Sequence, residues 1–103
     1  MLTIPETDDF SDIWPKYWTV EEFGDFCGWL ALNPEAGNII PCSGGCRKVR
    51  WSVDGRGKRG DARIIYVNRL ANGKIWLLTM YSKAVQKDVE RKVLNKLREK
   101  IDG

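Results

Sequence analysis

The chain has 103 residues and a formal net charge of +3, with 43% hydrophobic residues, five tryptophans and no histidine. A chain of this length has too few residues to close two hydrophobic cores, so we expect a single domain spanning residues 1–103. The hydrophobic content and the lack of an apolar run of about 18 residues argue against a disordered or membrane-spanning protein.

Charge is distributed unevenly along the chain. Residues 1–41 carry one basic and eight acidic side chains, a balance of −7, whereas residues 42–103 carry 16 basic and 6 acidic ones, a balance of +10. A basic half of this size favours an anionic partner such as nucleic acid, although oppositely charged halves can also face each other or solvent. The N-terminal MLTIPETDDF has neither a basic start nor an apolar run, so we expect no secretory signal and a cytoplasmic location.

The N-terminal residues predict a short edge strand and then a short helix. Leu2 and Ile4 alternate with polar neighbours, and the following proline, which lacks an N–H group, confines this strand to an edge or ends it. We expect the helix to be capped by Ser11 or Asp12 and to be limited to one or two turns by Pro15. The predicted inward side chains are Ile13, Trp14 and Tyr17.

A second helix has the clearest sequence signals. Thr19 and Glu22 have the spacing of a capping box, while Trp18 and Phe23 have the spacing of a hydrophobic staple. The helix ends at Asn33-Pro34, because the residue before proline avoids helical backbone angles. One apolar face contains Phe23, Phe26, Cys27 and Leu30, which makes Cys27 a core residue rather than a nucleophile.

Three strands are expected after a turn-rich link. Residues 47–53 alternate, so that Val49, Trp51 and Val53 point to one side and Lys48, Arg50 and Ser52 to the other. The loop GRGKRG (residues 55–60) reverses the chain into a return strand over residues 63–67. Asn72-Gly73 reverses it again into residues 74–81, whose apolar sequence predicts a central strand that is covered on both faces.

The C-terminal part predicts a helix from about Gln86. Its inward side is marked at intervals of four by Val85, Val89, Val93, Leu97 and Ile101. The predicted fold class is α+β, with an antiparallel sheet of three to four strands, two N-terminal helices and a C-terminal helix.

The residue inventory excludes several kinds of site. Without histidine the chain has no Ser-His-Asp triad, no Cys-His pair and no histidine acid or base. The odd number of cysteines, Cys27, Cys42 and Cys46, favours reduced thiols, and three thiols without histidine make a poor zinc site. The loop GRGKRG lacks the spacing GxxxxGK[ST] and lies between strands, unlike a phosphate-binding loop. We therefore predict neither a metal nor a cofactor.

Cations gather between residues 47 and 63. Alternation places Lys48 and Arg50 about 7 Å apart on one face of the sheet, close enough to reach one phosphate. If the hairpin brings Arg63 beside them, three fixed donors are available to stabilise charge on a phosphodiester. The same geometry also suits phosphate binding without reaction.

The sequence resembles the RelE/HigB branch of bacterial toxin–antitoxin toxins, within the RelE/ParE superfamily, from about Phe10 to Leu97. The resemblance rests on the ordered segments LALNPEAGNII, GGCRKVRWSVDGRGKRGDARIIYV and IWLLTMYSK. Its most specific parts are Asn33-Pro34, Gly44-Gly45, Arg47-Lys48, GRGKRG, residues 62–66 (ARIIY) and Tyr81-Ser82-Lys83.

The resemblance implies a RelE-like domain that cleaves translated mRNA on the ribosome by attack of a 2′-hydroxyl group. It also implies a neutralising antitoxin, commonly a helix-turn-helix protein, with the free toxin monomeric. By position in the motif, the catalytic candidates are Lys48, Arg50, Arg63 and Lys83. The RNA-binding candidates are Arg47, Arg56, Lys58, Arg59 and Tyr81, the last as a platform on which a base stacks.

Two positions depart from the family pattern. Ala84 occupies the position at which some RelE members carry a general-acid arginine, which leaves Lys83 as the candidate acid. Arg50 replaces a lysine that is sometimes credited as the base, and an arginine does not deprotonate at working pH. Lys48, surrounded by cations, is then the candidate base.

Alternative interpretations differ in class. The chain could be a ParE-like inhibitor of gyrase that acts by binding protein, or an inactive relative that binds nucleic acid. Arg63 could form a surface ion pair with Asp61, while Tyr66 and Trp76 lie in apolar strands and are expected in the core.

Overall fold

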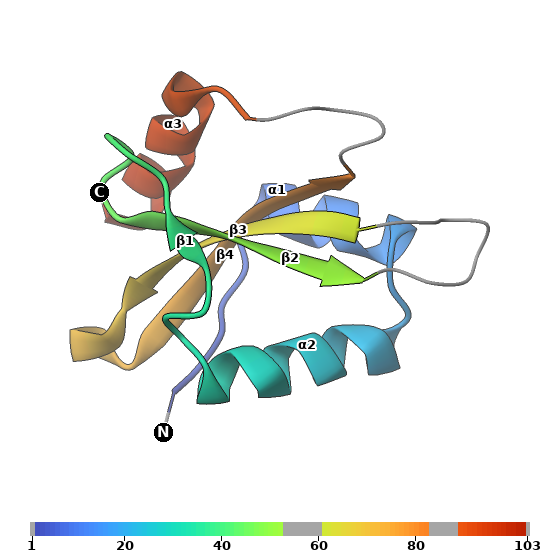
Figure 1. Ribbon diagram of the computed structural model, residues 1–103. Helices are drawn as coiled ribbons and strands as arrows, with labels where there is room; N and C mark the ends of the chain where they lie inside the picture. The colour runs from blue at the N-terminus through green and yellow to red at the C-terminus, as the bar shows by residue number, and fades with distance from the viewer. Residues whose placement is uncertain (1, 53–60, 83–88, 103) are drawn as a thin grey trace.

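Four strands form one sheet in the order β1-β2-β3-β4 in the computed structural model, which describes residues 2–52, 61–82 and 89–102 (Figure 1). All neighbouring strands are antiparallel. The strands are β1 (Asn38–Ile39), β2 (Cys46–Ser52), β3 (Asp61–Arg69) and β4 (Lys74–Ser82). The helices of the described part are α1 (Asp8–Ile13), α2 (Val20–Leu32) and α3 (Arg91–Asp102), with 3₁₀ turns at Trp14–Lys16 and Leu70–Asn72.

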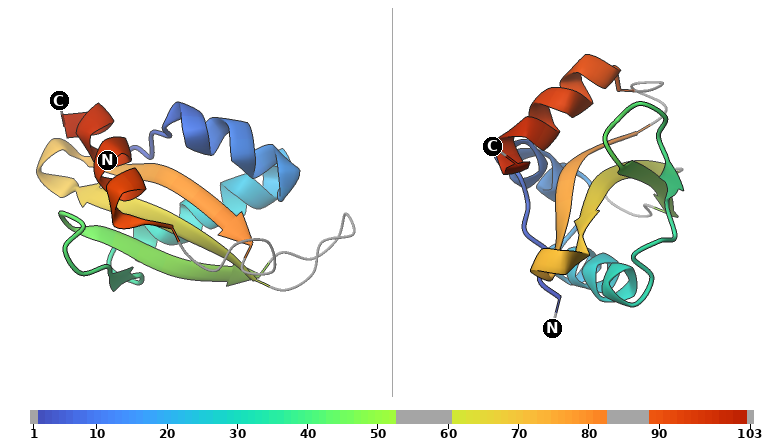
Figure 2. Two further views of the ribbon diagram at one scale, coloured as in Figure 1. Left: turned by 90° about the horizontal axis from the view of Figure 1, so that it is seen from above. Right: turned by 90° about the vertical axis from the view of Figure 1, so that its left-hand side faces the viewer.

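The sheet separates two hydrophobic clusters. Helix α3 lies on one side of the sheet and α2 on the other, as the right-hand view of Figure 2 shows. The cluster on the α1 and α2 side includes Phe10, Phe26 and Tyr66, and the cluster on the α3 side includes Ile65 and Leu94. Because side chains alternate along a strand, β3 supplies both clusters and is buried over most of its length.

Helix α2 confirms the strongest sequence prediction. The Thr19 hydroxyl accepts a hydrogen bond from Glu22 N at 3.1 Å, and Glu22 Oε1 accepts one from Thr19 N at 2.8 Å. The staple pair Trp18 and Phe23 is in contact, with ring centroids 6.1 Å apart. The helix ends at Leu32, with Asn33 as its C-cap.

The start of the first helix was predicted wrongly. The cap is Thr7, whose side chain accepts a hydrogen bond from Phe10 N, rather than Ser11 or Asp12. Asp8 and Asp9 lie in the first turn, where their negative charges stabilise the helix by interacting with the positive end of its dipole. Phe10 is the fully buried residue of this helix. The predicted inward residues 13, 14 and 17 are partly buried and pack against the hydrophobic cluster that contains Phe10.

The N-terminal segment borders β4 without forming a regular strand. It makes isolated parallel bridges at Thr3 with Lys74 and at Glu6 with Leu77. In the order of the four-stranded sheet, β4 is therefore an edge strand whose outer side is covered by this segment, not an interior strand. The prediction that both its faces are buried is confirmed, since the residues between Trp76 and Ser82 are all buried.

Strand pairing agrees with the predicted alternation on β2. Val49 is buried and Trp51 packs edge-on against Phe26 with centroids 5.1 Å apart, while Arg50 is exposed on the opposite face. The reversal at Asn72-Gly73 is also confirmed, because Gly73 adopts φ 69°, a left-handed conformation that favours glycine. The two-residue strand β1 was not predicted. Val53 and the loop GRGKRG lie outside the described residues.

The C-terminal helix begins later than predicted, and most of its predicted inward residues are confirmed. It begins at Arg91, after Val89, and the predicted residues Val85 and Gln86 lie outside the described part. The predicted residue Leu97 is buried, and Val89 and Ile101 pack against the same cluster. Val93 is 40% exposed, and Leu94 is buried in its place. Steps of four residues drift by roughly 40° each around an α-helix, so a strict interval of four does not keep every residue on the buried face.

The predicted α+β class, with an antiparallel sheet, two N-terminal helices and a C-terminal helix, is confirmed. No helix in the described ranges combines the length and the apolar character needed to cross a membrane.

Candidate functional site: a cationic pocket on the sheet

Three cationic side chains share one face of the β2–β3 hairpin. Arg50 and Arg63 are direct partners in the antiparallel register, and Lys48 lies two residues before Arg50 on the same strand. Residues that face each other across an antiparallel pair have Cβ atoms about 5 Å apart and point to the same side. The register therefore brings together the three cations that the sequence could place only separately.

These cations line a pocket of about 260 Å³ together with Asn38 of β1. Asn38 is the register partner of Lys48, so the pocket crosses three adjacent strands. It lies on the α3 side of the sheet, because Arg63 shares its face with the buried Ile65. A pocket lined by three cations and one amide fits an anionic ligand that also offers neutral hydrogen-bonding groups.

Arg63 is the best-positioned donor in this pocket. Its Nη1 atom is buried and has no hydrogen-bond partner among the described residues. The alternative ion pair of Arg63 with Asp61 is not formed; instead Asp61 lies 3.4 Å from Nε of Arg50, whose side chain is 68% exposed. Since buried donors are nearly always satisfied, this guanidinium N–H is a donor that an anionic group in the pocket could satisfy.

Arg47 occupies a different place from the one expected of an RNA contact. Alternation turns it to the face of β2 opposite Lys48, where its Nη1 atom donates to the backbone oxygens of Gly37 at 2.8 Å and Glu35 at 3.2 Å. Its guanidinium thus ties the segment before β1 to β2. RNA binding by Arg47 stays a prediction, from a face of β2 opposite the one that carries Lys48 and Arg50.

Tyr81 lies next to the cations but is covered. It is the register partner of Arg63 on β4, and it is only 4% exposed within the cluster beneath α3. In this conformation its ring belongs to the core, so stacking on a base would require the ring to be uncovered. Its predicted role as a stacking platform stays a prediction.

Several predicted site residues lie outside the described part of the chain. They are the candidate acid Lys83, its neighbour Ala84, and the loop cations Arg56, Lys58 and Arg59.

The three cysteines are free thiols and form no disulfide with one another. Burial, with a smaller contribution from the Glu6 carboxylate, raises the pKa of Cys27 to about 11, so this thiol stays protonated near neutral pH. Burial also raises the pKa of Cys46, while Cys42 is exposed. Cys27 is thus a core residue, as predicted. Within the described ranges, no three Cys, Asp or Glu side chains are grouped as a metal site would require.

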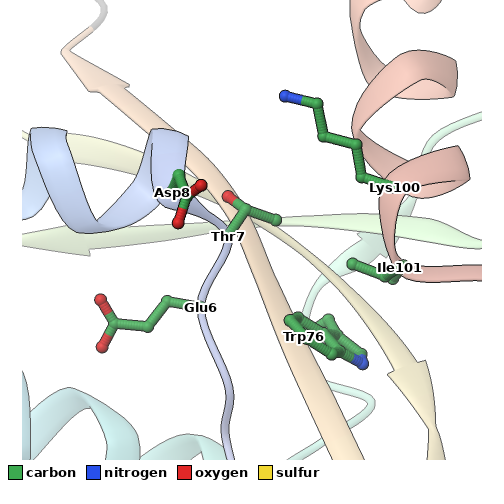
Figure 3. Close-up of a pocket in the computed structure, with 6 residues that line it drawn as sticks. All are labelled: Glu6, Thr7, Asp8, Trp76, Lys100 and Ile101. Atoms are coloured by element: carbon green, nitrogen blue, oxygen red, sulfur yellow. The ribbon is translucent and has the colours of Figure 1, made fainter.

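A second cavity of about 240 Å³ lies at the other edge of the sheet, between the N-terminal segment, β4 and α3 (Figure 3). It combines apolar and charged groups of both signs from Glu6, Thr7, Asp8, Trp76, Lys100 and Ile101. The Nζ atom of Lys100 lies 3.6 Å from Oδ1 of Asp9. Trp76 was expected in the core but is half-buried and lies at the edge of the hydrophobic cluster beneath α3. Tyr66 is fully buried, as expected.

Sequence reasoning did not identify Asn38 as a pocket residue. Only the short pairing of β1 with β2 brings it beside Lys48, and two residues are too few for a pattern of alternation to reveal a strand.

No protein-family model matches the chain. Among solved structures, a double arginine-to-alanine mutant of the E. coli toxin RelE, in its free state, matches with a TM-score of 0.63 and 13% sequence identity. The match covers 97% of this chain and 97% of that chain. The RelE-like fold implied by the sequence resemblance is therefore confirmed over nearly the whole chain.

Proposed function

From the RelE-like fold and the cationic pocket, we propose that the chain is the toxin of a toxin–antitoxin system and acts as a ribosome-dependent mRNA endoribonuclease. The observation that carries this proposal is the grouping of Lys48, Arg50 and Arg63 in one pocket, where a buried Arg63 donor has no partner among the described residues. Fixed cations of this kind stabilise the negative charge that develops on a phosphodiester during cleavage.

The proposed reaction uses the RNA's own 2′-hydroxyl group as nucleophile. The 2′-oxygen forms a bond to phosphorus as the bond from phosphorus to the 5′-oxygen breaks, which leaves a 2′,3′-cyclic phosphate and a 5′-hydroxyl. Arg63 and Arg50 hold the non-bridging oxygens, whose charge increases in the pentacoordinate transition state. The guanidinium groups keep their charge throughout, so neither takes part in proton transfer.

Two protons must move in this reaction. We assign removal of the 2′-hydroxyl proton to Lys48, because it is the lysine in the described lining of the pocket. We assign donation of a proton to the leaving 5′-oxygen to Lys83, which follows β4 directly in the sequence. Neither step requires a metal or a cofactor.

The proposal also defines partners. The substrate is mRNA on the ribosome, and the loop cations Arg56, Lys58 and Arg59 would contact its phosphate backbone. A helix-turn-helix antitoxin would neutralise the toxin in a hetero-oligomer, and the free toxin would be a cytoplasmic monomer.

A cleavage assay with purified ribosomes and programmed mRNA tests the proposal. Lys48→Ala and Arg63→Ala should each lower the cleavage rate by about 100-fold or more, since each removes a proton-transfer or charge-stabilising group. Lys96→Ala and Arg91→Ala are matched controls, because they remove the same charges from exposed positions on α3. Both control variants should cut at the wild-type rate, and circular dichroism should show that all four variants are folded.

Two outcomes would contradict the nuclease proposal. Intact mRNA together with accumulation of gyrase-cleaved DNA would indicate the ParE-like alternative. Unimpaired growth of a host after induction would indicate an inactive relative that binds nucleic acid.

A further inference from the structure

Asn38 is the neutral residue among the described residues that line the cationic pocket. It is exposed, it faces Lys48 across the β1–β2 pair, and within the described residues its side chain makes no hydrogen bond. No described strand continues the sheet beyond β1. A ligand that extends from the cations toward this edge therefore meets an amide with one acceptor oxygen and one donor NH₂ group.

The segment before Asn38 is held firmly from the opposite face. The Tyr66 hydroxyl accepts a hydrogen bond from Gly37 N and donates one to Pro34 O, both at 2.9 Å. Burial raises the pKa of Tyr66, so the hydroxyl keeps the proton that it donates. Arg47 adds its two bonds to the oxygens of Glu35 and Gly37.

Glycine is required at position 37 by this attachment. A Cβ atom there would lie 2.9 Å from both Cε1 and Oη of Tyr66 and 3.1 Å from Cβ of Arg47. Since β1 has only two residues, these contacts rather than a long ladder fix its register. The side chain of Asn38 is thus attached to a pre-organised backbone, as recognition of a defined hydrogen-bonding pattern requires.

The order of the pocket residues follows the order of groups in a nucleotide. In the proposed reaction, the phosphate lies over Arg50 and Arg63, and the attacking 2′-hydroxyl lies at Lys48. Asn38 lies one strand further, at a spacing of about 4.8 Å. The base on that side belongs to the nucleotide 5′ to the scissile phosphate, because this nucleotide carries the 2′-hydroxyl.

We propose that Asn38 reads the base 5′ to the scissile phosphate and selects adenine over guanine. Adenine offers an N6 donor beside an N7 acceptor, which matches the donor and acceptor of one amide, whereas guanine offers two acceptors at the same edge. This inference rests on the proposed function, which orients the RNA, and extends it to substrate selection by a residue that does not take part in the chemistry.

Binding of non-cleavable dinucleotides tests this proposal without catalysis. The two probes are 2′-O-methyl dinucleotides with one phosphate, differing only in adenine or guanine as the 5′ base, and their Kd values are measured by NMR titration. Wild type should bind the adenine probe about 5-fold more tightly or better. Asn38→Ala should bind both probes equally, with the weaker affinity of the guanine probe.

Asn72→Ala is the matched control, because Asn72 lies in the turn between β3 and β4, away from the pocket lining, and its loss should preserve the wild-type ratio. Tyr66→Phe should reduce the ratio while the phosphate contacts persist, as expected for a positioning residue. Equal binding of the probes by wild type, no binding of either, or an unchanged ratio in Asn38→Ala would overturn the inference.

Cleavage measurements separate this inference from the proposed function. If wild type prefers the adenine probe but cuts no mRNA, the nuclease proposal fails while base selection by Asn38 is supported. If wild type cuts mRNA without any preference for adenine over guanine 5′ to the cut, the nuclease proposal survives and the inference fails.

Discussion

At the scale of single residues, the two arginines of the pocket, Arg50 and Arg63, have different surroundings. Arg50 is 68% exposed and pairs with Asp61, whereas a guanidinium nitrogen of Arg63 is buried without a partner among the described residues. An exposed ion pair contributes little to stability, while an unsatisfied buried donor is costly until a ligand binds. Arg63 is therefore the cation whose position is explained least by folding and best by ligand binding.

Tyr66 provides a prediction about stability. Its hydroxyl is the described partner of the buried Gly37 N–H, so Tyr66→Phe leaves that donor unsatisfied. We expect a loss of about 1–3 kcal/mol in the free energy of unfolding, measured by urea denaturation. Tyr17→Phe is the comparison, since its hydroxyl accepts from Ser82 N in a half-buried position and should cost less. A Tyr66→Phe variant as stable as wild type would contradict the importance of this bond.

At the scale of elements, the helices and strands that were predicted correctly are those marked by residues close together in the sequence. Helix α2 begins where Thr19 and Glu22 satisfy each other's backbone, which requires only residues three apart. In helix α3, Val93 was wrongly predicted to face inward because Val93 and Leu94 are both apolar, and only packing against the sheet selects Leu94. Strand β1 was missed because its two residues acquire their conformation from β2 and from Tyr66.

The capping box gives a prediction for helix α2. Thr19→Ala removes the acceptor for Glu22 N and should cost about 1 kcal/mol, which lowers Tm by about 4–8 °C in a domain of this size. Glu22→Gln keeps a side chain that can still accept from Thr19 N and should change Tm much less. Thermal denaturation followed by circular dichroism measures both, and equal Tm values for Thr19→Ala and wild type would contradict the prediction.

At the scale of the whole molecule, an ionic cluster connects α3 to the sheet. Asp102 accepts two hydrogen bonds from Arg69 of β3, at 2.9 and 2.6 Å, and lies 3.5 Å from Arg98. Arg98 also donates to Ser43 O in the link between β1 and β2. The cluster thus joins the C-terminal helix to two parts of the chain that are distant in sequence.

This cluster makes stability depend on pH. The hydrogen bonds from Arg69 lower the pKa of Asp102 below its usual value of 3.8. A lowered pKa in the folded state means that the contribution of Asp102 is complete above the unfolded pKa and is lost as pH falls through the folded pKa. Asp102→Asn should therefore destabilise the protein at pH 7, and its difference from wild type should shrink below about pH 4.

Urea denaturation at pH 7 and at pH 3 measures this dependence. Asp25→Asn is the control, because Asp25 is exposed on α2 and has no ion pair in the described part of the chain, so its effect should be small at both pH values. A difference between Asp102→Asn and wild type that is the same at both pH values would argue against the cluster.

The amino-acid sequence by itself determined the fold class, the capped helix α2, the alternation of β2 and the concentration of cations between residues 47 and 63. These properties depend on the periodicity of residue types and on residues a few positions apart, both of which can be read directly from the sequence. The tertiary structure decided that Arg63 faces Arg50, that Arg47 turns away from them, and that Asn38 completes the pocket. These facts depend on strand register and on burial, which arise only when segments distant in sequence pack together.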